Sequence, residues 1–271
     1  MADGFELDGY LARIGHDGPV APDLATLAAL QAAHVDAIPF EGLDPLLGLP
    51  VKLELAAVRD KLIAGRRGGY CFEQNALFKA ALEAIGFRVT GLGGRVRWMS
   101  PPDSPLGPRT HMLLRVDLPD APYLADVGFG ACLLDAPLKF KPDVEQRTAM
   151  GTYRLTESGG LFSLSARRGE GWRTMYVFNL EPQLPSDYEL GNWFTSTSPL
   201  VPFTGTLILE RLSADKRYRL VNRRLTVEAR DGEVKSERVI ASPDELHQVL
   251  AETFNVTPPR PAEEIFGRLG E

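Results

Sequence analysis

Three side chains in this sequence could together perform nucleophilic catalysis: Cys71, His111 and Asp126. A cysteine thiolate is a strong nucleophile, a histidine can accept the thiol proton, and an aspartate can hold the imidazole ring in one tautomer. Cys71 follows two glycines and begins a helix-like run, where unpaired backbone N–H groups and the helix dipole favour the thiolate. The pattern indicates a cysteine nucleophile with a His–Asp pair as its base.

A structural alternative stays open for each of these residues. A lone cysteine is often a small buried hydrophobe, while His111 could simply end a strand and Asp126 could cap a turn. Asp126 lies in an apolar run, where an unpaired carboxylate would be costly. If the strands that begin at His111 and Tyr123 are antiparallel neighbours, Asp126 can reach His111. The spacing therefore permits a triad without requiring one.

The elements that must position these residues change in type at Gly86. Before it, apolar residues recur at helical spacing, and after it they alternate as in strands. The expected helices are 5–15, a helix that starts after Asp23 and ends before Pro39, 53–63, 71–85 and 243–254. The expected strands are 87–90, 95–98, 111–116, 123–127, 152–156, 161–166, 172–178, 206–212, 218–221, 225–229 and 234–239. Residues 187–203 look irregular, and the tail from Pro258 is expected to be extended.

Composition excludes several function classes. The chain has 271 residues, of which 44% are hydrophobic and 24% charged, and its net charge is −6. These values are typical of a globular protein, and the acidic balance disfavours nucleic-acid binding. No apolar run approaches the ~18 residues of a membrane span, so no membrane partner is expected. Two cysteines and no signal-peptide pattern favour a reducing, cytoplasmic location, and no Cys/His cluster has metal-ligand spacing, so no metal is expected.

Several motifs resemble those of the arylamine N-acetyltransferases. They are Arg67-Gly68-Gly69-Tyr70-Cys71-Phe72-Glu73, Tyr10-Leu11-Ala12-Arg13-Ile14-Gly15, Ile38-Pro39-Phe40-Glu41, Thr110-His111-Met112-Leu113-Leu114, Asp126-Val127-Gly128-Phe129-Gly130, Phe178-Asn179-Leu180-Glu181-Pro182 and Ser196-Thr197-Ser198-Pro199. The resemblance spans at least residues 5–205 in independent motifs, so chance explains it poorly. Gly42 departs from the family pattern without touching the triad. A second departure, in the segment 200–202, puts the details of acceptor or coenzyme A recognition in doubt but not the chemistry.

The resemblance implies an α+β fold with a cysteine-protease-like Cys-His-Asp site. A helical bundle at 1–85 would carry Cys71, and a β-barrel at 86–186 would carry His111 and Asp126. A connector at 187–205 and an α/β lid at 206–271 would follow. The implied activity is ping-pong transfer of acetyl from acetyl-CoA, through Cys71, to an arylamine, arylhydrazine or N-hydroxyarylamine. Acetyl-CoA is thus expected as a donor substrate, and the sequence does not indicate an oligomeric state.

A flat acceptor suits an aromatic pocket, because rings stack on rings. The candidate substrate-binding residues are Phe40, Phe129 and Phe203, with Thr110 and Gly130 from the motifs beside them. Gly128 and Gly130 are expected to keep the rim of the pocket open. The alternative for each phenylalanine is plain core packing.

Two other functions stay open at this point. An amide synthase that releases a polyketide-type acyl chain from a carrier protein would use the same triad, and neighbouring polyketide synthase genes would favour it. A non-catalytic module that binds coenzyme A or aromatic ligands is the alternative from another class. Such a module has no need of an intact Cys, His and Asp set, and alkylation of Cys71 would distinguish it from an enzyme.

Overall fold

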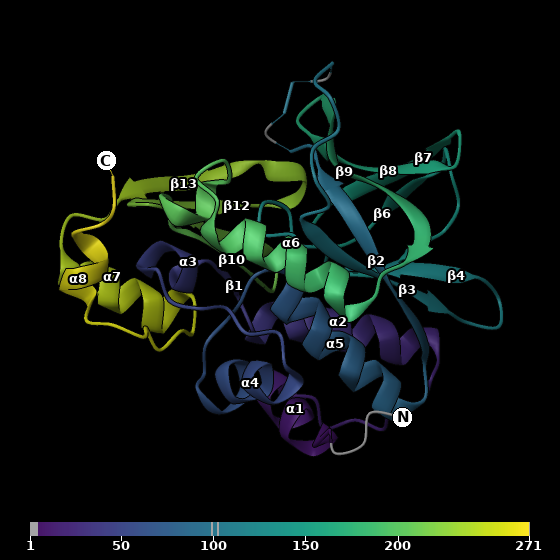
Figure 1. Ribbon diagram of the computed structural model, residues 1–271, viewed down its shortest axis with the longest axis horizontal. Helices are drawn as coiled ribbons and strands as arrows, with labels where there is room; N and C mark the ends of the chain where they lie inside the picture. Colours follow the sequence, from purple (N-terminus) through teal and green to yellow (C-terminus); the bar gives the residue numbers. More distant parts are fainter. Residues whose placement is uncertain (1–4, 99, 102, 271) are drawn as a thin grey trace.

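The computed structural model describes residues 5–98, 100–101 and 103–270. Residues 1–4, which belong to the N-terminal segment that lacks a signal-peptide pattern, lie outside the described residues. The described residues fold into a helical N-terminal part, a large antiparallel sheet and a smaller C-terminal sheet flanked by helices (Figure 1). The fold is therefore α+β, as the sequence predicts.

Helices dominate the first 85 residues and return near the C-terminus. Gly15 and Gly86 end α1 and α5 in the left-handed conformation that glycine adopts readily, with φ of 68° and 105°. Asp23 caps α2, since its carboxylate accepts a 2.8 Å bond from the N–H of Thr26. The helices are α1 (Leu7–Ile14), α2 (Leu24–Ala37), α3 (Leu43–Leu47), α4 (Leu55–Arg59), η1 (Asp60–Ala64), α5 (Cys71–Ile85), α6 (Pro185–Thr197), η2 (Pro202–Thr204), η3 (Arg230–Gly232), α7 (Pro243–Gln248), η4 (Val249–Thr253) and α8 (Ala262–Phe266).

The large sheet is an antiparallel, nearly closed barrel with the strand order β5-β4-β3-β2-β9-β8-β7-β6. Its two outer strands meet through Gln146 of β6, which accepts a 2.7 Å bond from the Lys139 N–H of β5 and donates a 2.9 Å bond to its carbonyl. The predicted barrel is thereby confirmed. Its strands are β2 (Arg88–Val96), β3 (His111–Asp117), β4 (Pro122–Ala125), β5 (Leu138–Lys139), β6 (Glu145–Arg147), β7 (Thr152–Ser158), β8 (Leu161–Arg168) and β9 (Gly171–Pro182).

The smaller sheet joins a strand from the N-terminal third of the chain to four strands from its C-terminal part. Its order is β1-β10-β11-β12-β13, and its edge strand β1 comes from the N-terminal third, with Phe40 opposite Glu210. Helices α7 and α8 lie beside this sheet, away from the barrel (Figure 1). The strands are β1 (Phe40–Glu41), β10 (Ile208–Ser213), β11 (Lys216–Val221), β12 (Arg224–Glu228) and β13 (Val234–Val239).

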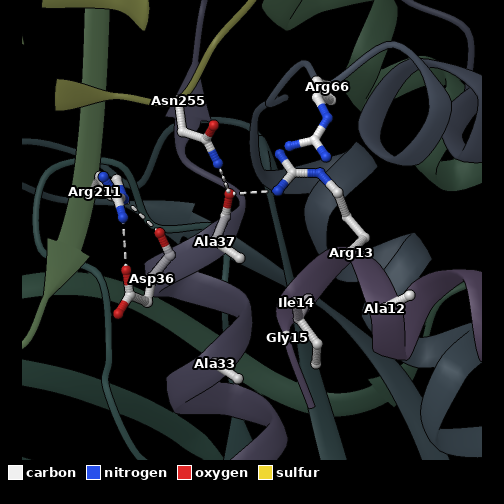
Figure 2. A pocket seen from close by; sticks show the side chains of 10 residues that line it. All are labelled: Ala12, Arg13, Ile14, Gly15, Ala33, Asp36, Ala37, Arg66, Arg211 and Asn255. Atoms are coloured by element: carbon white, nitrogen blue, oxygen red, sulfur yellow. Dashed lines mark hydrogen bonds and ion pairs between the residues drawn. The ribbon is translucent and has the colours of Figure 1, made fainter. Parts of the chain in front are cut away.

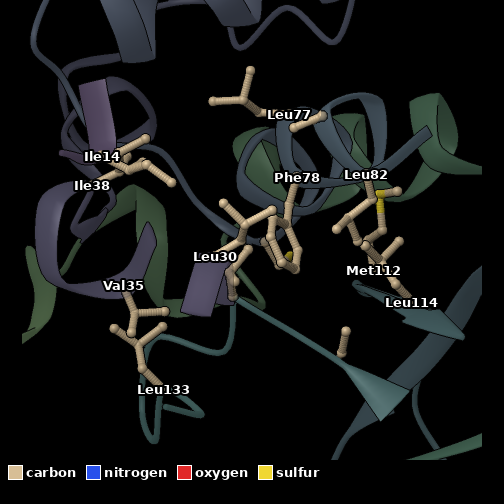
Figure 3. Packing of buried hydrophobic residues seen from close by; sticks show 14 of the residues in the cluster. Ile14, Leu30, Val35, Ile38, Leu77, Phe78, Leu82, Met112, Leu114 and Leu133 are labelled. Atoms are coloured by element: carbon tan, nitrogen blue, oxygen red, sulfur yellow. The ribbon is translucent and has the colours of Figure 1, made fainter. Parts of the chain in front are cut away.

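The core that supports the candidate site lies between helices and barrel. Figure 3 shows side chains of α2, α5 and β3 in one cluster, among them Leu30, Phe78 and Met112. All three are at most 3% exposed. Burial of a side chain of this size stabilises a fold by about 1.5–3 kcal/mol. This core fixes the start of α5 against the start of β3, which are the two places where Cys71 and His111 lie.

Three sequence predictions differ from the structure. The expected strands at 87–90 and 95–98 are one continuous strand, β2. The expectation of irregular structure over 187–203 is wrong for most of that range, because α6 occupies Pro185–Thr197 with a proline at its first position, where a missing N–H costs nothing. The tail is not extended throughout, since it contains α8. The domain boundaries at 85, 186 and 205 stay predictions.

Candidate active site

Cys71 is the first residue of α5 and is 5% exposed. Its Sγ lies 3.5 Å from the carbonyl oxygen of Thr110, which immediately precedes β3. The loop before it passes close to β1, because a Cβ on Gly68 would lie only 2.1 Å from the carbonyl oxygen of Pro39. The glycine therefore permits a backbone approach that no other residue allows. The thiol is held where a helix begins and where the barrel meets the helical part.

A buried network of charged side chains fixes the loop before Cys71. Lys61 of η1 pairs with Asp44 at 2.6 Å and with Glu73 at 2.7 Å. Arg67 pairs with Glu41 at 2.6 Å and with Asp44 at 2.7 Å. These residues belong to β1, α3, η1, the loop and α5. Because removal of one partner would leave a buried charge unpaired, the network holds the loop in a single arrangement.

His111 and Asp126 form the second half of the candidate site. His111 opens β3, Asp126 directly follows β4, and the two strands are antiparallel neighbours with Leu114 opposite Ala125. The sequence prediction of this pairing is confirmed. The His111 Nε2 lies 2.7 Å from Asp126 Oδ2, and both side chains are buried. This leaves Nδ1 as the ring nitrogen that can exchange a proton with Cys71.

The carboxylate of Asp126 accepts four hydrogen bonds in a fully buried position. Oδ2 accepts from His111 and from the Tyr176 hydroxyl at 2.9 Å. Oδ1 accepts from the Asn75 amide at 3.0 Å and from the Gly128 N–H at 2.9 Å. Sequence reasoning missed Tyr176 and Asn75. Asn75 lies one turn after Cys71 on the same face of α5, so a polar residue at that spacing was an available signal.

The surroundings of His111 favour its charged form. Burial lowers the pKa of His111, but the Asp126 carboxylate and then Cys71 raise it more, to about 10. Burial raises the pKa of Asp126, and His111, Asn75 and the Gly128 N–H outweigh that effect, so the pKa of the carboxyl is below its ordinary value. The geometry thus suits an imidazolium between a carboxylate and the thiol of Cys71.

A pH-dependent stability follows from the raised pKa of His111. A group whose pKa is raised on folding stabilises the fold fully below its unfolded pKa of about 6.5. That stabilisation is lost as the pH rises towards the folded pKa of about 10. We expect the unfolding free energy of the wild type, relative to His111→Gln, to be largest near pH 6 and to shrink steadily up to pH 10. Urea unfolding at each pH measures this difference, and a constant difference across the range would contradict the prediction.

Gly128 allows the segment after β4 to lie directly on α5. A Cβ at this position would lie 2.7 Å from Cys71 Cα and 2.7 Å from Asn75 Nδ2. The expectation that Gly128 and Gly130 keep a rim open is therefore wrong. Both permit close packing, since a Cβ on Gly130 would lie 2.2 Å from the ring of Phe40.

We expect Gly128→Ala to destabilise the protein by about 1–3 kcal/mol, because the added methyl group overpacks the contact with Cys71. The displaced segment carries Asp126, so any activity that depends on the Cys71, His111 and Asp126 side chains should fall with stability. Thermal unfolding and initial rates measure the two effects. Gly107→Ala is the matched control, because a Cβ there has no atom within 4 Å; a Gly128→Ala variant as stable and active as this control would refute the packing argument.

The aromatic residues expected near the site differ in their surroundings. The Phe129 ring packs edge-on against His111, with centroids 5.2 Å apart and an interplanar angle of 89°. Phe40 is buried, and its ring lies 5.9 Å from that of Phe203. Phe203 is half-buried and also packs against Tyr70 at 5.8 Å. Among the three, Phe203 is the ring with a partly open surface, while the other two have substantial packing roles.

Across the ranges 5–98, 100–101 and 103–270, no helix is long and apolar enough to cross a membrane. In the same residues, no group of three or more His, Cys, Asp and Glu side chains could hold a metal ion.

Comparisons with known proteins agree on one family. A protein-family model described as N-acetyltransferase matches residues 23–261. The arylamine N-acetyltransferase of Mycolicibacterium smegmatis is 46% identical over 226 residues, which is 82% of each chain. The arylamine N-acetyltransferase of Escherichia coli K12 is 38% identical over 251 residues, which is 92% of this chain and 88% of the relative.

Solved structures give the same result. The arylamine N-acetyltransferase of Mycobacterium marinum is similar to this chain with a TM-score of 0.92 and 36% identity, over 97% of this chain and 99% of that one. The same enzyme in complex with CoA is similar with a TM-score of 0.91 and 36% identity, over 98% of this chain and 100% of that one. The likeness covers the helical part, the barrel and the C-terminal sheet together.

Proposed function

This chain belongs to the arylamine N-acetyltransferase family of acyltransferases, and on that premise we propose that it transfers acetyl from acetyl-CoA to arylamines, arylhydrazines and N-hydroxyarylamines through an acetyl-Cys71 intermediate. The observation that carries the proposal is the thiol of Cys71 at a helix N-terminus beside His111, whose ring is held 2.7 Å from buried Asp126. A CoA donor is supported by the Mycobacterium marinum relative, which has been solved in complex with CoA.

In the first half-reaction the Cys71 thiolate adds to the thioester carbonyl of acetyl-CoA. The carbonyl oxygen becomes an oxyanion. We expect N–H groups at the start of α5 to stabilise it, because the first N–H groups of a helix have no intrahelical acceptor. The bond between the acyl carbon and the CoA sulfur then breaks. The departing sulfur takes a proton from the His111 imidazolium, and acetyl-Cys71 with a neutral imidazole is left.

In the second half-reaction the acceptor nitrogen adds to the carbonyl of acetyl-Cys71. His111, neutral after the first step, accepts the proton that the nitrogen loses. The bond to Cys71 Sγ breaks, and the thiolate–imidazolium pair forms again. Asp126 stabilises the imidazolium in both halves through its 2.7 Å contact with Nε2. An arylamine is largely neutral at pH 7, so its lone pair is available without a strong base.

The acceptor pocket is part of the proposal. We assign its wall to Phe129 and Phe203, with the Phe40–Gly130 contact behind Phe203 and Thr110 beside the thiol. Flat acceptors suit these rings, because offset and edge-on contacts between rings are favourable. The cytoplasmic location expected from composition stays a prediction.

Steady-state kinetics test the proposed order of steps. Initial rates are measured against acetyl-CoA at several fixed concentrations of a simple arylamine such as 4-aminobenzoate. A double displacement gives parallel double-reciprocal lines, because CoA leaves before the amine reacts. Intersecting lines would overturn the ping-pong proposal, and an absence of turnover with free arylamine would favour the amide synthase alternative.

A further inference from the structure

A cavity of about 440 Å³ lies between α1, the end of α2 and β10, and four of its ten lining residues are charged (Figure 2). Its volume falls within the roughly 300–1,000 Å³ of small-molecule sites. Three arginines contribute to the lining: Arg13 of α1, Arg66 of the loop that leads to Cys71, and Arg211 of β10. Among the described residues that line it, Asp36 is the only acid. The cavity therefore has an excess of positive charge.

Arg211 and Asp36 neutralise each other. Arg211 Nη2 lies 2.8 Å from Asp36 Oδ1, and Arg211 Nε donates to the backbone carbonyl of Asp36. Arg211 Nη1 donates to the Thr253 carbonyl at 2.9 Å. All three nitrogen atoms of this guanidinium are thus engaged. The charge of Arg13 and Arg66 is left without an acid in the cavity.

Arg13 has one free donor group. Its Nε donates to the Leu62 carbonyl at 2.9 Å and its Nη1 to the Ala37 carbonyl at 2.8 Å, so the side chain is held in place. Its Nη2 is buried and has no hydrogen-bond partner within the described part of the chain. A buried donor without an acceptor costs free energy, and most such groups in folded proteins are paired. Burial lowers the pKa of Arg13 most, and the neighbouring charges of Arg66 and Arg211 lower it further, to about 10.

Arg66 adds the second unpaired cation. Its backbone has φ of 46°, in the left-handed region that residues other than glycine seldom adopt. Its side chain is exposed and has no hydrogen-bond or ion-pair partner in the ranges that the structure describes. Its carbonyl accepts a 3.1 Å bond from the N–H of Thr257, which ties this loop to the C-terminal segment. Two guanidinium groups beside each other repel unless an anion lies between them.

We propose that this cavity is a binding site for a small oxyanion of the phosphate class, held by the guanidinium groups of Arg13 and Arg66. Phosphate oxygens match the planar donors of arginine, and a dianion balances the two unpaired cations. The bound anion draws together α1, the loop that leads to Cys71 and the C-terminal segment. The site is separate from the proposed acetyl-transfer site, and its test does not depend on that activity.

Thermal unfolding of the full chain tests the proposal. Sodium phosphate is titrated at constant pH and ionic strength, with sodium chloride as the balancing salt. We expect a saturable rise in Tm of about 2–5 °C for the wild type. Arg66→Ala should lose this rise, and the variant should fold because the Arg66 side chain is exposed. Arg88→Ala removes the same charge at an exposed position of β2, outside the cavity lining, and should keep the rise.

The other outcomes are equally definite. Competition by glycerol phosphate would support the site and identify a phosphomonoester as its ligand, whereas a rise with inorganic phosphate alone would support a site for the free ion. An unsaturable rise, or an equal rise in Arg66→Ala, would overturn the proposal. It would also be overturned if acetyl-CoA displaced phosphate and Arg66→Ala raised the KM for acetyl-CoA several-fold, because the cavity would then belong to the donor site.

Discussion

Cys71→Ala is expected to lower the rate of acetyl transfer by at least about 10⁴-fold while leaving the protein folded. The variant has no sulfur to accept the acetyl group, and the neighbouring groups can only orient a direct transfer. The fold should survive because the side chain is small and a thiol, here 3.5 Å from the Thr110 carbonyl oxygen, is only a weak hydrogen-bond donor. A stability loss of about 0.5–3 kcal/mol is expected. Cys71→Ser should be similarly inactive, because a hydroxyl ionises far less readily than a thiol.

The second cysteine provides a matched control for this prediction. Cys132 is also buried, at 2% exposure, and its Sγ lies 3.9 Å from the Tyr153 hydroxyl. Cys132→Ala should therefore keep acetyl transfer within a few-fold of the wild type. Initial rates and thermal unfolding of both variants measure the contrast. Full activity in Cys71→Ala, or equal loss in both variants, would refute the assignment of the nucleophile.

Asp126→Asn is expected to impair both activity and stability. The two carboxylate oxygens each accept two hydrogen bonds, from His111 and Tyr176 on one side and from Asn75 and Gly128 on the other. An asparagine amide must turn its NH₂ group towards one of these pairs of donors, so neither orientation satisfies the site. The loss of the buried charge partner should cost about 3–5 kcal/mol. Acetyl transfer should fall by up to about 10⁴-fold, as in other triads that lose this carboxylate.

Tyr176→Phe gives a graded comparison for Asp126. It removes one donor to Oδ2 but keeps the carboxylate and its 2.7 Å contact with His111. We expect a stability loss of about 0.5–1.5 kcal/mol and a modest change in rate. Initial rates and urea unfolding of both variants measure the difference. An Asp126→Asn variant with the rate and melting temperature of the wild type would show that Asp126 is peripheral.

The sequence predicts the parts of the site that depend on local pattern. The helix Cys71–Ile85 follows from apolar spacing and from Gly86, and the structure has the same bounds. The pairing of β3 with β4 follows from two apolar runs joined by a short turn, and it brings His111 to Asp126. These features are encoded within short segments, where backbone geometry and polarity act directly on neighbouring residues.

The sequence does not predict the parts that depend on distant segments. Tyr176 lies 50 residues after Asp126, and its position in an alternating run indicates only an ordinary strand residue. Its hydroxyl nevertheless donates one of the four hydrogen bonds that the Asp126 carboxylate accepts. Strand β1 cannot be predicted from its own two residues either, because they form a strand only by pairing with β10, far along the chain. Helix α6 has only a weakly apolar face, and Leu190 and Trp193 on it are exposed, so its pattern does not indicate a helix.

The most direct test of the proposed acetyl-Cys71 intermediate is the intact mass of the protein after mixing with acetyl-CoA, measured again after free acetyl-CoA has been removed and an arylamine added. The account predicts one added acetyl group that maps to Cys71, is absent in Cys71→Ala, and disappears as the N-acetylarylamine forms. An acetyl group on another residue, or one that persists in the presence of the amine while product accumulates, would contradict it.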